Sequence, residues 1–257
     1  MSRPAPLVTA VFAQAAMEAR LTARRGENLL AIIGLPAAAL VFFGTMGVAG
    51  TSGGVAGGAA GSPTPIERLL PAVLALGIVA SGLVNLGIAT AYERGYGVLK
   101  RLGGAPLGRP GLLAAKLLVV AAIALVQVAA LVMLATVLGW RPVSSTSWLG
   151  VTIATIAGIA AFAGFGLLVA GALRPEAALV VANGLFLAAI LLGGVPVPLA
   201  DLPGPVAAVA RLLPTGALAD AFDRALSGRG DIAVPLAMVV AWALAAFAAA
   251  ARTFRWE

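Results

Sequence analysis

Long apolar runs are the feature that most restricts what this chain folds into. Several runs of about 20 residues have no charged side chain well inside them, and a helix of that length crosses a hydrocarbon core of roughly 30 Å. Only 11% of the 257 residues are charged, whereas a soluble domain has about a quarter. Most of the surface must therefore face lipid, and we predict an all-α, polytopic membrane protein whose single domain is residues 1–257.

The apolar runs predict six membrane-spanning helices. These spans are 29–50, 69–91, 112–139, 148–173, 177–194 and 232–251. Before them, residues 1–28 show helical spacing of apolar residues and end in a basic group, which is typical of a cytoplasmic, interfacial helix on the membrane surface. A frayed tail is the alternative. After the fifth span, residues 195–231 contain five prolines among apolar residues, and we expect short re-entrant helices on the extracellular side.

The distribution of charge predicts the orientation of the chain. With both termini in the cytoplasm, 12 basic residues fall on the inner segments and 5 on the outer ones, while the ten acidic residues divide equally. Basic residues accumulate on cytoplasmic loops, so this orientation is favoured. The net charge of +7 is then a topology signal, and a nucleic-acid partner is not expected.

The sequence lacks residue types that several kinds of chemistry require. It has no histidine and no cysteine, which excludes zinc sites of the usual kind, thiol nucleophiles and serine–histidine hydrolysis. We expect no metal site and no catalytic residue. No acidic or basic residue lies well inside a predicted span, which disfavours a proton-driven transporter or an intramembrane enzyme. No GxxxxGK[ST] motif occurs, so any ATP and magnesium would bind a separate polypeptide. The polar side chains Asn85, Gln127 and Asn183 either line a substrate path or join helices by hydrogen bonds.

The stretch YERGYGVLKRLGGAPLGRPGLLAAK, from Tyr92 to Lys116, places six charges between two apolar runs. Residues 92–111 predict a cytoplasmic amphipathic helix with Tyr96, Leu99 and Gly103 on one side. Gly103 and the following glycine would end this helix, and a proline turn would lead into the third span. A polar loop that only fixes topology is the alternative. Leu107 lies between Pro106 and Pro110, and an exposed apolar residue framed by two prolines favours a docking surface for a cytoplasmic protein.

This stretch resembles the signature region of ABC-2 type exporter permeases. The matching positions are Glu93, Arg94, Tyr96, Gly97, Leu99, Lys100, Arg101, Ala105, Pro106, Leu107, Arg109 and Lys116. The segment before the last span is similar to the extracellular pattern of the same family. Its matching positions are Pro203, Pro214, Asp220 and Arg224. Because Asp220 and Arg224 are four residues apart, we also expect them to form an ordinary surface ion pair on a helix.

The resemblance implies the membrane subunit of an exporter in the bacterial plasma membrane, from the subgroup that includes drug- and antibiotic-resistance permeases. Two such subunits, identical or related, would pair among membrane lipids, and each would bind one ABC ATPase subunit. The Glu93–Arg109 region would then couple the ATPase to the membrane helices. A hydrophobic or lipid-linked substrate is expected because the spans carry so little polarity. A non-transporting, accessory subunit is the alternative.

Overall fold

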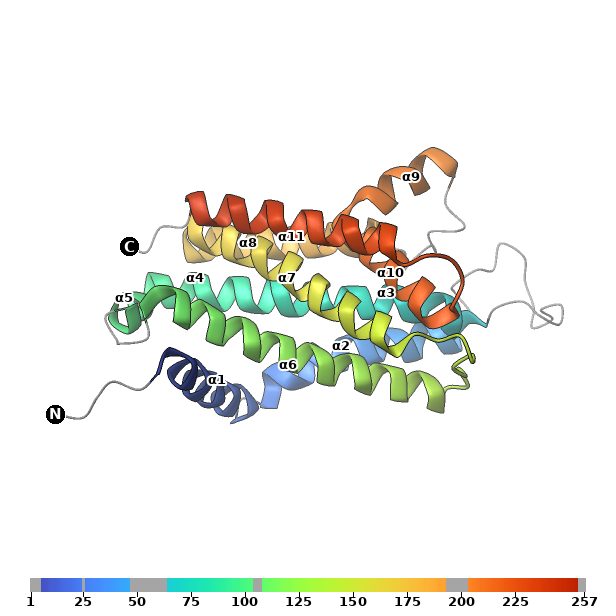
Figure 1. Ribbon diagram of the computed structural model, residues 1–257, viewed down its shortest axis with the longest axis horizontal. Coiled ribbons are helices and arrows are strands. Elements are labelled where there is room, and N and C mark those ends of the chain that lie inside the picture. The colour runs from blue at the N-terminus through green and yellow to red at the C-terminus, as the bar shows by residue number, and fades with distance from the viewer. Residues whose placement is uncertain (1–5, 25, 47–63, 104–107, 193–202, 254–257) are drawn as a thin grey trace.

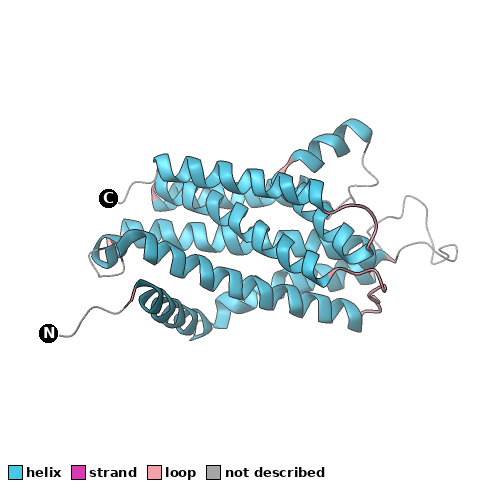
Figure 2. Cartoon of the chain, viewed as in Figure 1, coloured by secondary structure: helices cyan, strands magenta, loops and turns pink. Residues whose placement is uncertain are grey.

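The computed structural model describes residues 6–24, 26–46, 64–103, 108–192 and 203–253, and all regular structure in these ranges is helical (Figure 2). The helices are α1 (Leu7–Arg24), α2 (Gly26–Thr45), α3 (Pro65–Val79), the π-helical segment η1 (Ala80–Leu86), α4 (Gly87–Gly95), α5 (Val98–Gly103), α6 (Gly108–Val137), α7 (Trp148–Ala172), α8 (Pro175–Leu192), α9 (Gly204–Leu212), α10 (Pro214–Ser227) and α11 (Ala233–Thr253).

Four of these helical stretches are long and apolar enough to cross a membrane. They are Pro65–Gly95, which joins α3, η1 and α4, and Pro110–Val137, Trp148–Ala172 and Ala233–Thr253. Two further apolar helices, Ile32–Thr45 and Pro175–Leu191, are shorter within the described residues. The all-helical membrane architecture is therefore confirmed. The count of six spans stays a prediction.

The long helices form one bundle whose two ends differ (Figure 1). The end of α4, α5, the start of α6, the end of α7 and the end of α11 gather at one end. The start of α3, the end of α6, the start of α7 and α10 lie at the other, and α9 projects away from the bundle there. We call the first of these the α5 end and the second the α10 end.

The α3–α4 stretch begins where a capping box forms. The backbone N–H of Glu67 donates to the Thr64 hydroxyl at 3.3 Å, and the Thr64 N–H donates to the Glu67 carboxylate at 2.7 Å. These two bonds satisfy backbone donors that a helix start leaves unpaired, and Pro65 is suited to the first helical position. Nearly every residue from Ile66 to Val79 is buried, so α3 runs through the core rather than along its surface.

Helix α7 lies at the centre of the bundle, against α3, η1, α4, α10 and α11. Small residues let the backbones approach closely. A Cβ atom at Gly166 would lie 2.4 Å from the carbonyl oxygen of Gly82, and one at Gly82 would lie 2.8 Å from the Ala163 nitrogen. A side chain at either glycine would push α7 and η1 apart, so this contact requires glycine on both helices.

Helix α10 closes the α10 end of the bundle. Its Leu218 and Phe222 side chains are fully buried, and the helix contacts both α3 and α7. Helix α9 is more peripheral: it buries only Ala207 and Ala210. The indole N–H of Trp242 on α11 donates to the Leu212 carbonyl at 2.9 Å, which ties the end of α9 to the bundle. Short helices before the last span, as predicted, are therefore present, while their re-entrant placement stays a prediction.

Helix α1 confirms the predicted N-terminal helix. It packs Val11 and Ala15 against Ala115, Val119 and Ile123 of α6. Five other apolar residues of α1 are exposed, namely Leu7, Val8, Phe12, Met17 and Leu21. Exposed apolar residues on a helix with basic residues at its end are typical of a helix at the membrane surface, and this placement of α1 stays a prediction.

Candidate coupling region

The stretch predicted to form one amphipathic helix is divided by a turn. Helix α4 ends at Gly95, Gly97 has φ +71°, and α5 begins at Val98. A positive φ is easy for glycine and strained for other residues, so Gly97 permits the chain to change direction here. The prediction of a single helix from Tyr92 to Gly103 is therefore wrong. Residues 92–95 form the end of α4, and the chain turns before α5 begins.

The turn separates side chains that the sequence was expected to place together. Leu99 is fully buried, whereas Tyr96 is 74% exposed, so the predicted shared face of Tyr96 and Leu99 is wrong. Lys100 and Arg101 are exposed on α5. Helix α5 contacts α4 and α6, and its buried Leu99 anchors it in the bundle. The exposed basic residues of α5 are left facing outward.

Arg94, the last basic residue of α4, reaches the C-terminal end of α7. Its guanidinium group donates to the backbone carbonyls of Gly171 and Leu173. The last carbonyls of a helix have no partner within that helix, and a cation there also favours the helix dipole. Arg94 therefore joins the base of the α4–α5 turn to the central helix of the bundle.

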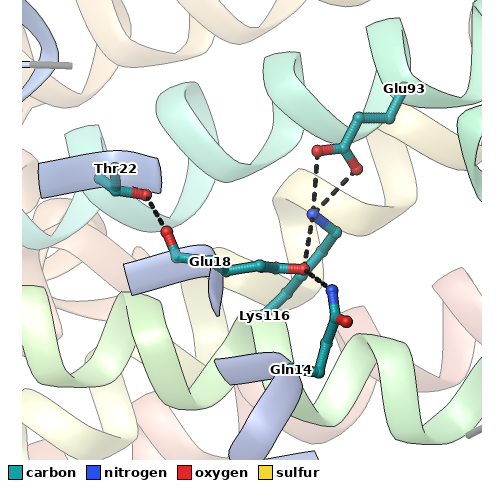
Figure 3. Close-up of polar contacts among 5 residues, drawn as sticks. All are labelled: Gln14, Glu18, Thr22, Glu93 and Lys116. Carbon is teal, nitrogen blue, oxygen red and sulfur yellow. Dashed lines mark hydrogen bonds and ion pairs between the residues drawn. The ribbon is translucent and has the colours of Figure 1, made fainter. Parts of the chain in front are cut away.

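A buried lysine joins three helices next to this turn (Figure 3). The ammonium group of Lys116 on α6 lies 2.9 Å from both carboxylate oxygens of Glu93 on α4 and 3.4 Å from a carboxylate oxygen of Glu18 on α1. The Gln14 side-chain amide donates to the Glu18 carboxylate at 3.0 Å. Because the Lys116 side chain is only 9% exposed, its charge depends on the two carboxylates rather than on water.

These contacts divide the predicted coupling residues into two groups. Glu93, Arg94 and Leu99 point into the bundle, and Lys100 and Arg101 point outward. The predicted residues Ala105, Pro106 and Leu107 lie outside the described residues. Arg109 belongs to the first turn of α6, and its side chain also lies outside the description.

The three polar residues predicted for a substrate path lie apart from one another. Gln127 is fully buried on α6 and donates to the Ile32 carbonyl of α2 at 2.7 Å, as expected for a residue that joins helices. Asn183 is exposed on α8 and donates to the Leu179 carbonyl of its own helix at 2.8 Å. Asn85 is half-buried on η1.

At the α10 end, the predicted pair Asp220 and Arg224 forms a two-pronged ion pair with contacts of 2.8 and 3.1 Å. Arg224 also donates to the Asp231 carbonyl at 2.8 Å, and its hydrogen bond with Asp220 raises the pKa of the guanidinium group. Pro203 immediately precedes α9, and Pro214 is the first residue of α10. The ion pair therefore belongs to α10 alone, and the two prolines mark where the short helices begin.

Asp223 lies about one helical turn after Asp220 and immediately precedes Arg224. Its side chain reaches solvent, yet reduced hydration and, second, the nearby Asp220 carboxylate raise its pKa above 3.8. Arg229 and Arg224 act in the opposite direction but do not cancel these effects. Among the described residues, no group of three or more acidic side chains is placed to hold a metal ion.

The contacts of Lys116 with α1 and α4 were not predicted, although the sequence carries part of their signal. A lysine in the first turns of an apolar helix needs a partner, and Lys116 was identified only as a matching position. Gln14 and Glu18 are four residues apart and so lie on one face of α1. Nothing in the sequence pairs that face with Lys116, since α1 and the start of α6 are about 90 residues apart.

Comparison with known proteins identifies the family of this chain. Residues 60–252 match the ABC-2 family transporter proteins, a range that takes in the helices from α3 to nearly the end of α11. No curated protein matches the chain. Because the family match covers more than half of the 257 residues, this chain belongs to the ABC-2 family of transporter proteins.

Proposed function

We propose that this chain is the permease subunit of an ATP-driven exporter in the bacterial plasma membrane, with both termini in the cytoplasm. Membership of the ABC-2 family carries the proposal, because it identifies the membrane subunit of an ABC transporter and implies an ABC ATPase as partner. The described helices and the absence of a Walker motif from the sequence agree with a subunit that leaves ATP hydrolysis to that partner.

The ATPase is proposed to transmit its movement to the permease at the α5 end of the bundle. The exposed residues Lys100 and Arg101, with residues 104–109 that follow them in the sequence, would face the ATPase. Leu99 links α5 to the bundle, Arg94 links its base to α7, and Lys116 links α4 to α6 and α1. A displacement of α5 would thus reach four helices through direct contacts rather than through a flexible loop.

The proposed substrate is hydrophobic, amphiphilic or lipid-linked. The apolar stretches contain few polar side chains, and the one buried lysine is already paired with two carboxylates. A path with so little polarity offers a charged solute nothing to replace its water shell. Of the three candidate path residues, half-buried Asn85 on η1 suits the role best, because π-helical turns are frequent at functional sites.

The proposed assembly contains two permease subunits and two ATPase subunits. We expect the neighbouring reading frame to encode an ABC ATPase, and co-expression of a tagged chain with that ATPase tests this assignment. We expect the ATPase to co-purify in equal amount. Recovery of the intact permease without any ATPase would contradict the proposal and favour an accessory membrane protein.

A charge-reversal pair locates the contact. Lys100→Glu combined with Arg101→Glu should reduce the co-purified ATPase several-fold, because both side chains are exposed on the proposed docking surface. Arg141→Glu is the matched control: Arg141 is also exposed but follows α6 at the α10 end. Equal losses in both variants would contradict a contact at α5.

A further inference from the structure

Helix α2 contains a proline that interrupts its hydrogen bonds. Pro36 lies in the interior of this helix and has no backbone N–H. In an unbroken α-helix, the N–H four residues after Ile32 would donate to the Ile32 carbonyl. The proline therefore leaves that carbonyl without its usual partner, and in a membrane helix a neighbouring element must supply one.

Gln127 supplies the missing donor. Its side-chain amide nitrogen lies 2.7 Å from the Ile32 carbonyl oxygen, and the Gln127 side chain is fully buried. The bond joins α6 to α2 at the one backbone carbonyl that Pro36 has released. An apolar side chain at position 127 would leave this carbonyl unsatisfied.

The other end of the Gln127 amide contacts the irregular turn of a third helix. The Ser81 hydroxyl on η1 lies 3.1 Å from the Gln127 carbonyl oxygen and 3.0 Å from the Gly77 carbonyl. Ser81 is fully buried and belongs to the π-helical segment that interrupts the α3–α4 stretch. One glutamine thus bridges two helix irregularities that lie on different helices.

We propose that Gln127 is a positioning residue that joins the proline break of α2 and the π-helical turn η1 into one hinge, which bends during transport. The proposal rests on the proposed function as a transporter. Prolines, π-helical turns and side chains inserted into a helical hydrogen-bond ladder are the usual sites at which helices bend. All three meet at Gln127. Bending at only one helix would break a buried hydrogen bond to the other, so the two helices bend together.

The first test is a double-mutant cycle on melting temperature in detergent. Gln127→Met keeps a similar side-chain volume and removes both contacts, and we expect it to lower the melting temperature by about 3–6 °C. Pro36→Ala returns an N–H to α2, so Ile32 no longer needs Gln127. In the Pro36→Ala background, Gln127→Met should therefore lower the melting temperature by less than half as much. Equal losses in the two backgrounds would overturn the proposal.

A control on the same helix separates this effect from general damage to α6. The Thr136 hydroxyl donates only to the Met133 carbonyl of its own helix, at 2.7 Å. Thr136→Val should cause the same small change of melting temperature in the protein that has Pro36 and in the Pro36→Ala background. A change that depends on position 36 would show that coupling is a general property of α6 and would overturn the role given to Gln127.

The second test asks whether the hinge moves. In vesicles containing the permease and its ATPase, Pro36→Ala should lower the rate of ATP hydrolysis at least three-fold although the protein melts at a higher temperature. A purely structural role predicts the opposite, that activity follows stability. An unchanged hydrolysis rate in Pro36→Ala would overturn the hinge. If no ATPase binds the unsubstituted chain, the proposed function fails, and the melting cycle still decides whether Gln127 joins the two irregular turns.

Discussion

Lys116 on α6 holds its ammonium group 2.9 Å from both carboxylate oxygens of Glu93 on α4. Glu93 is the last acidic residue before the α4–α5 turn, and Lys116 lies in the first turns of the following long helix. The pair therefore closes the base of the segment that we propose to bind the ATPase. Glu18 on α1 adds a third group at 3.4 Å, so α1 is joined to the same point.

Lys116→Met should destabilise the protein because it leaves the partly buried Glu93 carboxylate without its counter-charge. We expect a loss of about 1–3 kcal/mol, less than for a fully buried pair because Glu93 retains some contact with solvent. Thermal unfolding in detergent measures it. Lys100→Met removes the same charge from an exposed position and should change stability by no more than about 0.5 kcal/mol. Similar losses in the two variants would contradict the role of the Lys116 pair.

Glu18→Gln should loosen α1 without unfolding the bundle. The contact with Lys116 is 3.4 Å long, and Lys116 keeps Glu93 as its partner, so the global loss should stay below about 1 kcal/mol. Hydrogen–deuterium exchange of residues 7–24 should nevertheless become several-fold faster. Arg20→Gln, an exposed change on the same helix, is the control. Unchanged exchange in Glu18→Gln would show that apolar packing alone holds α1.

Arg94→Ala removes the hydrogen bonds that cap the C-terminal end of α7. We expect a loss of about 2 kcal/mol, because the bonds are charge-assisted and partly buried. Faster hydrogen exchange should appear in the last turn of α7. Arg101→Ala, from the exposed face of α5, should leave that turn unchanged. If both variants behave alike, Arg94 acts as a surface charge and not as a cap.

Asp223→Asn tests the raised pKa of Asp223. An acid whose pKa is raised by folding binds its proton more tightly in the folded state, so its contribution to stability is lost as pH rises from 3.8 through the raised value. At pH 7 the variant should melt at the same temperature or up to about 2 °C higher, with a flatter profile between pH 4 and 7. Asp220→Asn should instead lower the melting temperature, since Asp220 pairs with Arg224. A lower melting temperature for Asp223→Asn at pH 7 would contradict the raised pKa.

The sequence predicted those features that depend on neighbouring residues. Apolar length predicted the long helices, Gly97 was recognised within the signature region, and the spacing of Asp220 and Arg224 predicted their pairing on a helix. The resemblance to ABC-2 permeases, read from residues 93–116 and the segment before the last span, agrees with the family match.

Features that depend on distant contacts were not predictable. No local sequence pattern distinguishes the π-helical turn η1 from an ordinary α-helix. It forms where Gly82 packs against α7 and the Ser81 hydroxyl contacts the Gln127 side chain. Gln127 was recognised as polar, but its partner is a carbonyl released by a proline 91 residues earlier in the chain. The division of the Tyr92–Gly103 stretch depends on Leu99 packing into the bundle, which no local pattern distinguishes from a continuous amphipathic helix.

The most direct test of coupling is the rate of ATP hydrolysis by the reconstituted permease–ATPase complex carrying Leu107→Asp. Val143→Asp is the control, since it adds the same charge to an exposed apolar residue at the α10 end. We expect Leu107→Asp to lower the rate at least several-fold at equal permease content, while Val143→Asp matches the unsubstituted complex. An unchanged rate in Leu107→Asp would contradict the assignment of this segment as the input from the ATPase.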